Sequence, residues 1–140
     1  MRDPLNKTIV DIKPSGIRKF FDIVAEMKDA ISLGVGEPDF ETPWHIREEG
    51  IYSLEKGRTY YSSNAGIKEL RQEICNYLDR RFNLHYSWNN EVLVTIGGSE
   101  AIDMALRVML DRDDEVLIPQ PSYVSYEPCV IMAGGKSVII

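Results

Sequence analysis

The chain has 140 residues, which is enough for one domain of ordinary size. Its 16 Lys and Arg against 22 Asp and Glu give a formal net charge of −6, so it lacks the positive field that attracts nucleic acid or anionic membranes. The 44% of apolar residues are typical of a folded domain, no apolar run reaches the roughly 18 residues that span a bilayer, and no secretory signal opens the chain. We therefore expect a cytoplasmic enzyme or binding domain, with no nucleic-acid or membrane partner.

The first half of the chain predicts helices separated by turn-rich segments. Ser15 is a candidate cap for the first helix, and Thr42 with Pro43 predicts the start of a helix that Gly57 ends. A loop that carries Tyr60 and Tyr61 follows. The elements predicted in this half are a helix from residue 17, a strand over 30–33, a helix over 43–56 and a helix over 67–82.

The second half alternates between strands and helices. The predicted elements are a strand over 91–96, a helix that follows the hydroxyl residue 99 and is marked by apolar residues over 102–109, a strand over 115–118, a helix over 123–132 and a strand over 137–140. This alternation with short connections predicts an α/β layered domain. Because buried strands usually lead onward, we expect Ile140 to be a break in a longer chain.

The strongest chemical signal lies where the strand over 91–96 meets the next helix. Gly97 and Gly98 allow a tight turn, and Ser99 could cap the helix and also donate to a phosphate oxygen. Free N–H groups and the positive end of the helix dipole favour an anion there. The alternative is that the two glycines serve only the turn, and the spacing alone leaves both interpretations open.

Other candidate residues carry weaker signals. The glycines at 34 and 36 indicate either a backbone held close to a ligand or an ordinary turn. Tyr123 could stack on a planar ring beside the glycine-rich turn, or fill the edge of a core. Cys75 and Cys129 lack the spacing of metal ligands, so we expect two reduced thiols and no metal site.

Five segments in order make a more specific pattern. They begin at residues 34, 60, 94, 114 and 121, and read GVGEPDFETP, YYSSNAGIKELR, VTIGGSEA, DEVLIP and PSYVSY. Together they resemble the N-terminal third of the class I/II aminotransferases, pyridoxal-phosphate enzymes of fold type I, in their aspartate aminotransferase-like branch. The resemblance implies a three-layer αβα fold. It also implies an arm and small-domain segment over residues 1–43, and the start of the large cofactor-binding domain over residues 44–140.

The resemblance assigns cofactor roles to four residues. Gly98 and Ser99 match the positions that hold the phosphate of pyridoxal 5′-phosphate. Glu100 stands where many relatives carry Gln, so its backbone N–H is the contact that the resemblance implies. Tyr123 matches the aromatic residue that stacks on the pyridine ring.

The resemblance also implies roles for two residues earlier in the chain. Tyr61 matches a tyrosine that reaches the partner subunit's cofactor phosphate, so the resemblance implies a homodimer. Gly36 matches a backbone position beside the carboxylate of the amino-acid substrate.

The activity that the resemblance implies is transfer of an amino group between an amino acid and a 2-oxo acid. The aldimine lysine of the family is expected beyond Ile140, so we expect no catalytic residue within these 140 residues and no activity from them alone. One alternative is a β-eliminating C–S lyase of the same fold. Another is a short non-catalytic chain that binds or oligomerises, whose open strand edge at 138–140 would need a partner.

Overall fold

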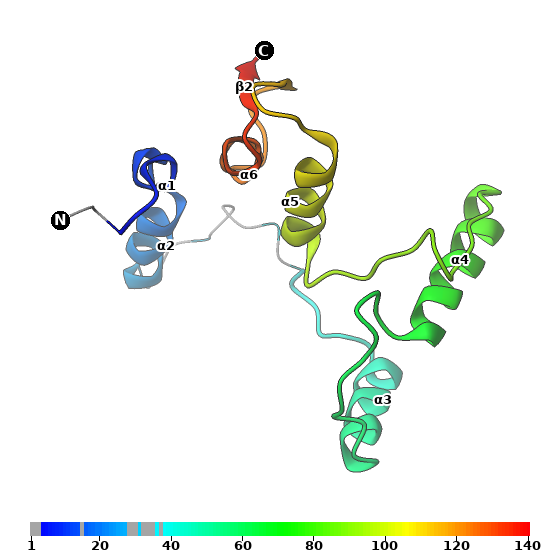
Figure 1. Cartoon of the computed structure of the whole chain (residues 1–140). Helices are drawn as coiled ribbons and strands as arrows, with labels where there is room; N and C mark the ends of the chain where they lie inside the picture. Colours follow the sequence, from blue (N-terminus) through cyan, green and yellow to red (C-terminus); the bar gives the residue numbers. More distant parts are fainter. Residues whose placement is uncertain (1–3, 15, 28–30, 32–35, 37) are drawn as a thin grey trace. The chain divides into compact units, whose positions relative to one another are not determined.

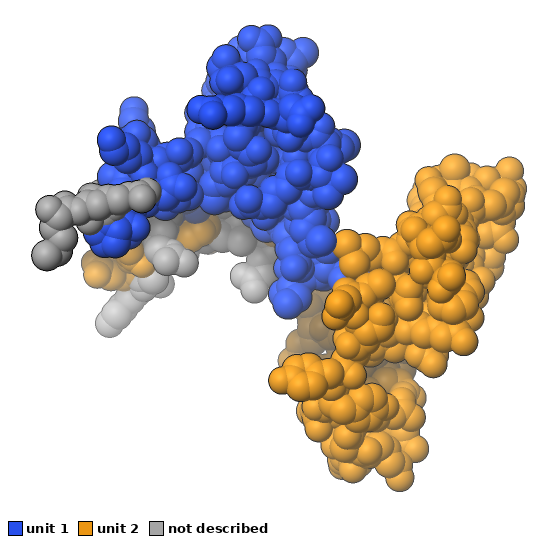
Figure 2. Space-filling model, in the orientation of Figure 1, with its two compact units in different colours: residues 1–18, 94–140 blue, residues 19–93 orange. Residues whose placement is uncertain are grey.

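The computed structural model describes residues 4–14, 16–27, 31, 36 and 38–140. Its elements, in chain order, are α1 (Lys7–Asp11), α2 (Ile17–Glu26), α3 (Trp44–Glu55), α4 (Lys68–Phe82), α5 (Gly98–Met109), β1 (Glu115–Ile118), α6 (Tyr126–Ala133) and β2 (Lys136–Ile139) (Figure 1). They fall into two compact units, one of residues 1–18 with 94–140 and one of residues 19–93 (Figure 2). The predicted domain division after residue 43 refers to a longer protein and stays a prediction.

The first unit contains the sheet. β1 and β2 pair in parallel, in a register that sets Glu115 opposite Lys136 and Ile118 opposite Ile139. A parallel pair needs a crossover connection, and α6 supplies it. Both strands lie within one residue of their predicted positions, as expected for β-branched and apolar runs bounded by turns.

The core of this unit lies between the sheet and α6. Ile118 of β1 and Cys129 and Val130 of α6 are buried there. The turn that follows α6 is tightly packed, because a Cβ atom added at Gly135 would lie 3.0 Å from Leu110 Cδ1. α6 also packs against α5, so a single short helix joins the sheet to the helix that opens with the glycine-rich turn.

The second unit confirms both of its long predicted helices. α3 ends before Gly57, whose φ of +66° is a left-handed conformation that glycine adopts without strain. α4 buries Arg71, which donates from Nη1 to the carbonyl oxygen of Trp88 at 3.0 Å. The predicted cap at Thr42 is wrong by one position, because Pro43 occupies the N-cap position and no side-chain cap bond forms.

Two local predictions differ from the structure, and one short helix has no counterpart among the predictions. Residues 91–96 form no strand, because a strand needs a hydrogen-bonded neighbour and the sheet of the described residues contains β1 and β2 alone. α6 begins at Tyr126 and not at residue 123, since a turn closed by the Tyr126 N–H and the Tyr123 carbonyl precedes it. α1 was not predicted, although Asn6 caps it by accepting from the Thr8 N–H.

Some sequence predictions concern residues that the structure does not describe. The cap at Ser15, residue 30 and residues 32–34 of the predicted strand and turn lie outside the described residues. Across the part of the chain that the structure describes, no helix combines the length and apolar character needed to cross a bilayer.

Candidate functional site

The site begins with the backbone of the glycine-rich turn. Gly97 has φ +82° and ψ 166°, a conformation almost confined to glycine, and it is the N-cap residue of α5. The expectation that Ser99 caps the helix is therefore wrong, because Ser99 is the second residue of α5 and the cap has no side-chain bond. Its hydroxyl group is left for other partners.

Ser99 and Tyr123 meet across 24 positions of sequence. A hydrogen bond joins Ser99 Oγ to Tyr123 Oη at 3.0 Å. Hydrogen bonds with the side chains of Ser125 and then Ser99 lower the pKa of Tyr123. The ring packs edge-on against Tyr126, with centroids 5.7 Å apart, and Tyr123 remains 50% exposed. Two predicted site residues thus lie together in one unit, with the aromatic ring accessible.

Glu100 turns its carboxylate back along the chain. Its Oε2 accepts a hydrogen bond from the Ile96 N–H, before the helix begins. A carboxylate in the first turn of a helix interacts favourably with the helix dipole. The side chain is thus bonded within the chain, and its backbone N–H is the group for which the resemblance implies a contact with the phosphate.

The donors at the start of α5 fit a phosphate ester. The first amides of a helix, here those of Gly98, Ser99 and Glu100, have no acceptor within the helix. The Ser99 hydroxyl adds a donor, and a Cβ built at Gly98 meets nothing within 4 Å, so the approach is open. With the Tyr123 ring beside it, this arrangement suits an anion that is joined to a flat aromatic ring.

Tyr61 and Gly36 belong to the other unit. Tyr61 has a fully exposed side chain, and a Cβ built at Gly36 meets nothing within 4 Å. The structure brings Ser99 and Tyr123 together, and it establishes no contact of Tyr61 or Gly36 with them. Their roles stay predictions.

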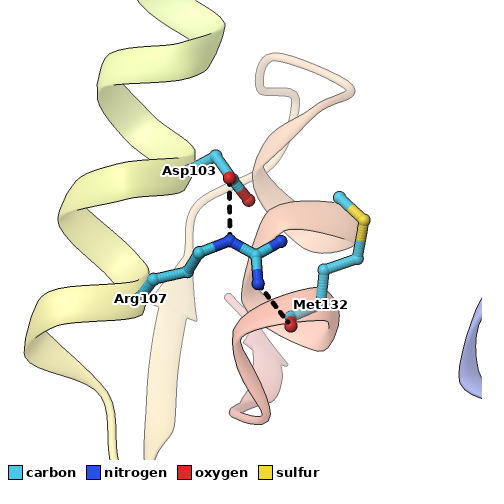
Figure 3. Close-up of polar contacts among 3 residues, drawn as sticks. All are labelled: Asp103, Arg107 and Met132. Atoms are coloured by element: carbon cyan, nitrogen blue, oxygen red, sulfur yellow. Dashed lines mark hydrogen bonds and ion pairs between the residues drawn. The ribbon is translucent and has the colours of Figure 1, made fainter. Parts of the chain in front are cut away.

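A polar cluster further along α5 was missed by the sequence analysis. Arg107 Nε donates to Asp103 Oδ2 at 2.8 Å, and Arg107 Nη1 donates to the Met132 carbonyl oxygen at 3.4 Å (Figure 3). The spacing of four residues between an acid and a base on a helix could have revealed the ion pair. The contact with Met132 depends on tertiary packing, which no local pattern shows.

Comparison with known proteins places this geometry in a family. The family model described as aminotransferase class I and II matches residues 28–140. The Bacillus subtilis protein YugH is 53% identical over 138 residues, which are 99% of this chain and 36% of that protein. Aspartate aminotransferase of Pyrococcus abyssi is 50% identical over 91% of this chain and 33% of its own length. A Thermus thermophilus aspartate aminotransferase mutant superposes with a TM-score of 0.86 at 35% identity, over 100% of this chain and 37% of that structure.

The chain belongs to the class I and II aminotransferase family. Its fold is the α/β fold of the aspartate aminotransferase-like proteins of fold type I, as the resemblance in sequence implied. The chain spans about a third of the length of the relatives that it matches, and it corresponds to their N-terminal part.

Proposed function

We propose that the protein containing this chain transfers amino groups between amino acids and 2-oxo acids with pyridoxal 5′-phosphate as cofactor. In this proposal Gly98, Ser99 and Glu100 hold the cofactor phosphate at the start of α5, and Tyr123 lies against the ring. The observation that carries it is the hydrogen bond between Ser99 and Tyr123, which sets an anion-binding helix start beside an aromatic ring.

The chain's own residues contribute binding and orientation. The first amides of α5 and the Ser99 hydroxyl hold the phosphate, while the Tyr123 ring fixes the plane of the pyridine. Anchoring at both ends restricts rotation, so that the bond to be broken at the substrate α-carbon can lie perpendicular to the ring. The cofactor, when bound, supplies the electron-withdrawing ring that stabilises negative charge at that carbon.

Three finer assignments accompany this proposal. Tyr61 contacts the partner subunit's cofactor phosphate in a homodimer, and its full exposure in the described structure leaves it free to do so. Gly36 lies beside the substrate carboxylate. Residues 1–43 form the arm and the small-domain segment, and residues 44–140 form the start of the large domain. The protein works in the cytoplasm, where the free, buried thiols of Cys75 and Cys129 would stay reduced.

The experiment that tests the function analyses products of the native protein. We expect amino donor plus 2-oxo acid to give a new amino acid and a new 2-oxo acid, only when pyridoxal 5′-phosphate is present. Pyruvate with ammonia from a cysteine-type substrate would instead identify the C–S lyase alternative. No turnover of either kind would favour the non-catalytic alternative and contradict the proposal.

A second experiment tests whether the 140 residues catalyse amino transfer by themselves. We expect no amino transfer from them, because the lysine that bonds the cofactor is expected beyond Ile140. Transfer by a product of verified 16.0 kDa mass would contradict that expectation.

A further inference from the structure

One side of α5 carries three polar residues at regular spacing. Ser99, Asp103 and Arg107 are four positions apart, so they follow one face of the helix for two turns. Ser99 and Arg107 each contact α6 or the turn that precedes it. Ser99 bonds to Tyr123 there, and Arg107 bonds to the carbonyl oxygen of Met132.

Asp103 lies between these two contacts and is the more enclosed member of its ion pair. Its Oδ2 accepts from Arg107, while its Oδ1 is buried and has no hydrogen-bond partner among the described residues. The carboxylate also acts on the buried thiol of Cys129, whose pKa is raised by burial first and by Asp103 second. Its bond to Arg107, which itself contacts Met132, sets Asp103 on the side of α5 that carries the polar contacts with α6.

The apolar contacts between α5 and α6 hold the two helices together through side-chain packing. Polar bonds add a directional constraint on their register, because a hydrogen bond weakens steeply when its distance or angle changes. Arg107 is eight residues from Ser99, which corresponds to about 12 Å along the axis of α5. Directional bonds at both ends of that length oppose sliding and rotation together, and Figure 3 shows the one from Arg107 to Met132.

We propose that Arg107, oriented by Asp103, is a positioning residue for the cofactor site, because its bond to the last turn of α6 keeps Tyr123 against Ser99. The part of this inference that concerns the cofactor rests on the proposed function. The part that concerns the Ser99–Tyr123 contact does not.

The test uses the native protein with Arg107→Gln, which removes the ion pair, and Asp103→Asn, which removes the charge that orients the arginine. Arg112→Gln is the matched control, because Arg112 is 93% exposed in its side chain and its carboxylate partner is 4.0 Å away. One measurement is the pH titration of Tyr123 in the cofactor-free protein, by NMR of ring-labelled tyrosine assigned with Tyr123→Phe. The other is the dissociation constant of pyridoxal 5′-phosphate.

We expect both variants to raise the pKa of Tyr123, since the bond to Ser99 is lost, and to weaken cofactor binding about three- to tenfold. The double variant should do no more than either single one, because both act on one contact. The control should leave both measurements unchanged.

The two measurements separate this inference from the proposed function. If the Tyr123 titration moves in the variants while even the native protein binds no cofactor, positioning stands and the proposed function fails. If the native protein binds the cofactor and neither measurement moves in Arg107→Gln or Asp103→Asn, the positioning role is wrong.

Discussion

At the scale of single residues, Glu100 presents a conflict between folding and binding. Its carboxylate accepts from the Ile96 N–H and lies near the positive end of the α5 dipole, which favours the helix. The same negative charge opposes a phosphate at the same helix end. A neutral side chain of the same shape would keep the acceptor and remove the repulsion.

We therefore expect Glu100→Gln to tighten pyridoxal 5′-phosphate binding about two- to fivefold, the size of one charge effect at a helix end. A fluorescence titration of the native protein measures it. Glu73→Gln, which removes a helix carboxylate in the other unit, is the control and should leave the affinity unchanged. Weaker binding by Glu100→Gln would show that the carboxylate helps to hold the cofactor.

The phenol of Tyr123 reports on its two hydroxyl partners. Ser125 lowers the pKa of Tyr123 most and Ser99 next, so loss of either partner raises it. We expect the pKa of Tyr123 to be higher in both variants than in the native protein. We expect it to be higher in Ser125→Ala than in Ser99→Ala. Ultraviolet titration, with Tyr123→Phe subtracted, measures the order. A Ser99→Ala variant with the native titration would mean that the Ser99–Tyr123 bond is absent in solution.

At the scale of elements, the turn before α5 depends on one backbone conformation. Because Gly97 has φ +82° and ψ 166°, any side chain there is strained. We expect Gly97→Ala to lower the free energy of unfolding by about 1–3 kcal/mol. Urea denaturation of the variant and of the native protein measures the difference. Gly50→Ala is the control, since Gly50 lies inside α3 with open space around it, and should stabilise by up to about 1 kcal/mol. Equal effects of the two substitutions would contradict this account of the turn.

Elements whose signals are local were predictable from sequence. α4, β1 and β2 lie within one residue of their predicted positions, because apolar spacing and bounding turns determine them. The segment over 91–96 has the same apolar character but forms no strand, since strand formation depends on a neighbour and not on the segment itself.

The candidate site also combines features that the sequence shows with contacts that only the fold creates. The glycine-rich turn and its helix start are visible in the sequence, because backbone conformation restricts the residues that can occupy them. The bond between Ser99 and Tyr123 and the bond between Arg107 and Met132 join residues more than 20 positions apart. Such contacts depend on how α6 packs against α5, which no local pattern contains.

At the scale of the whole molecule, the described residues bury little apolar surface. Their buried apolar side chains are Ile118, Val130 and the two cysteines, whereas Ile96 and Val108 are 93% and 85% exposed. Surfaces of this kind are normally covered by further protein. The relatives, of which this chain spans about a third, have further chain that could cover them.

We therefore expect the 140 residues alone to bind a hydrophobic dye strongly and to self-associate, since exposed apolar patches favour both. Dye fluorescence and sedimentation velocity measure these properties, with the native protein as control. A monomer that binds no dye and unfolds in one cooperative transition would show that these residues cover their own core.

We propose that the start of α5 holds the phosphate of the cofactor beside Tyr123. The most direct measurement compares the affinities of the native protein for pyridoxal 5′-phosphate and for pyridoxal, which lacks the phosphate. Ser99→Ala is tested in parallel, with Ser53→Ala in α3 as control. We predict that the native protein and the control bind the phosphate form far more tightly, and that Ser99→Ala loses about three- to tenfold of that preference. Equal binding of the two compounds by the native protein, or an unchanged preference in Ser99→Ala, would contradict the account.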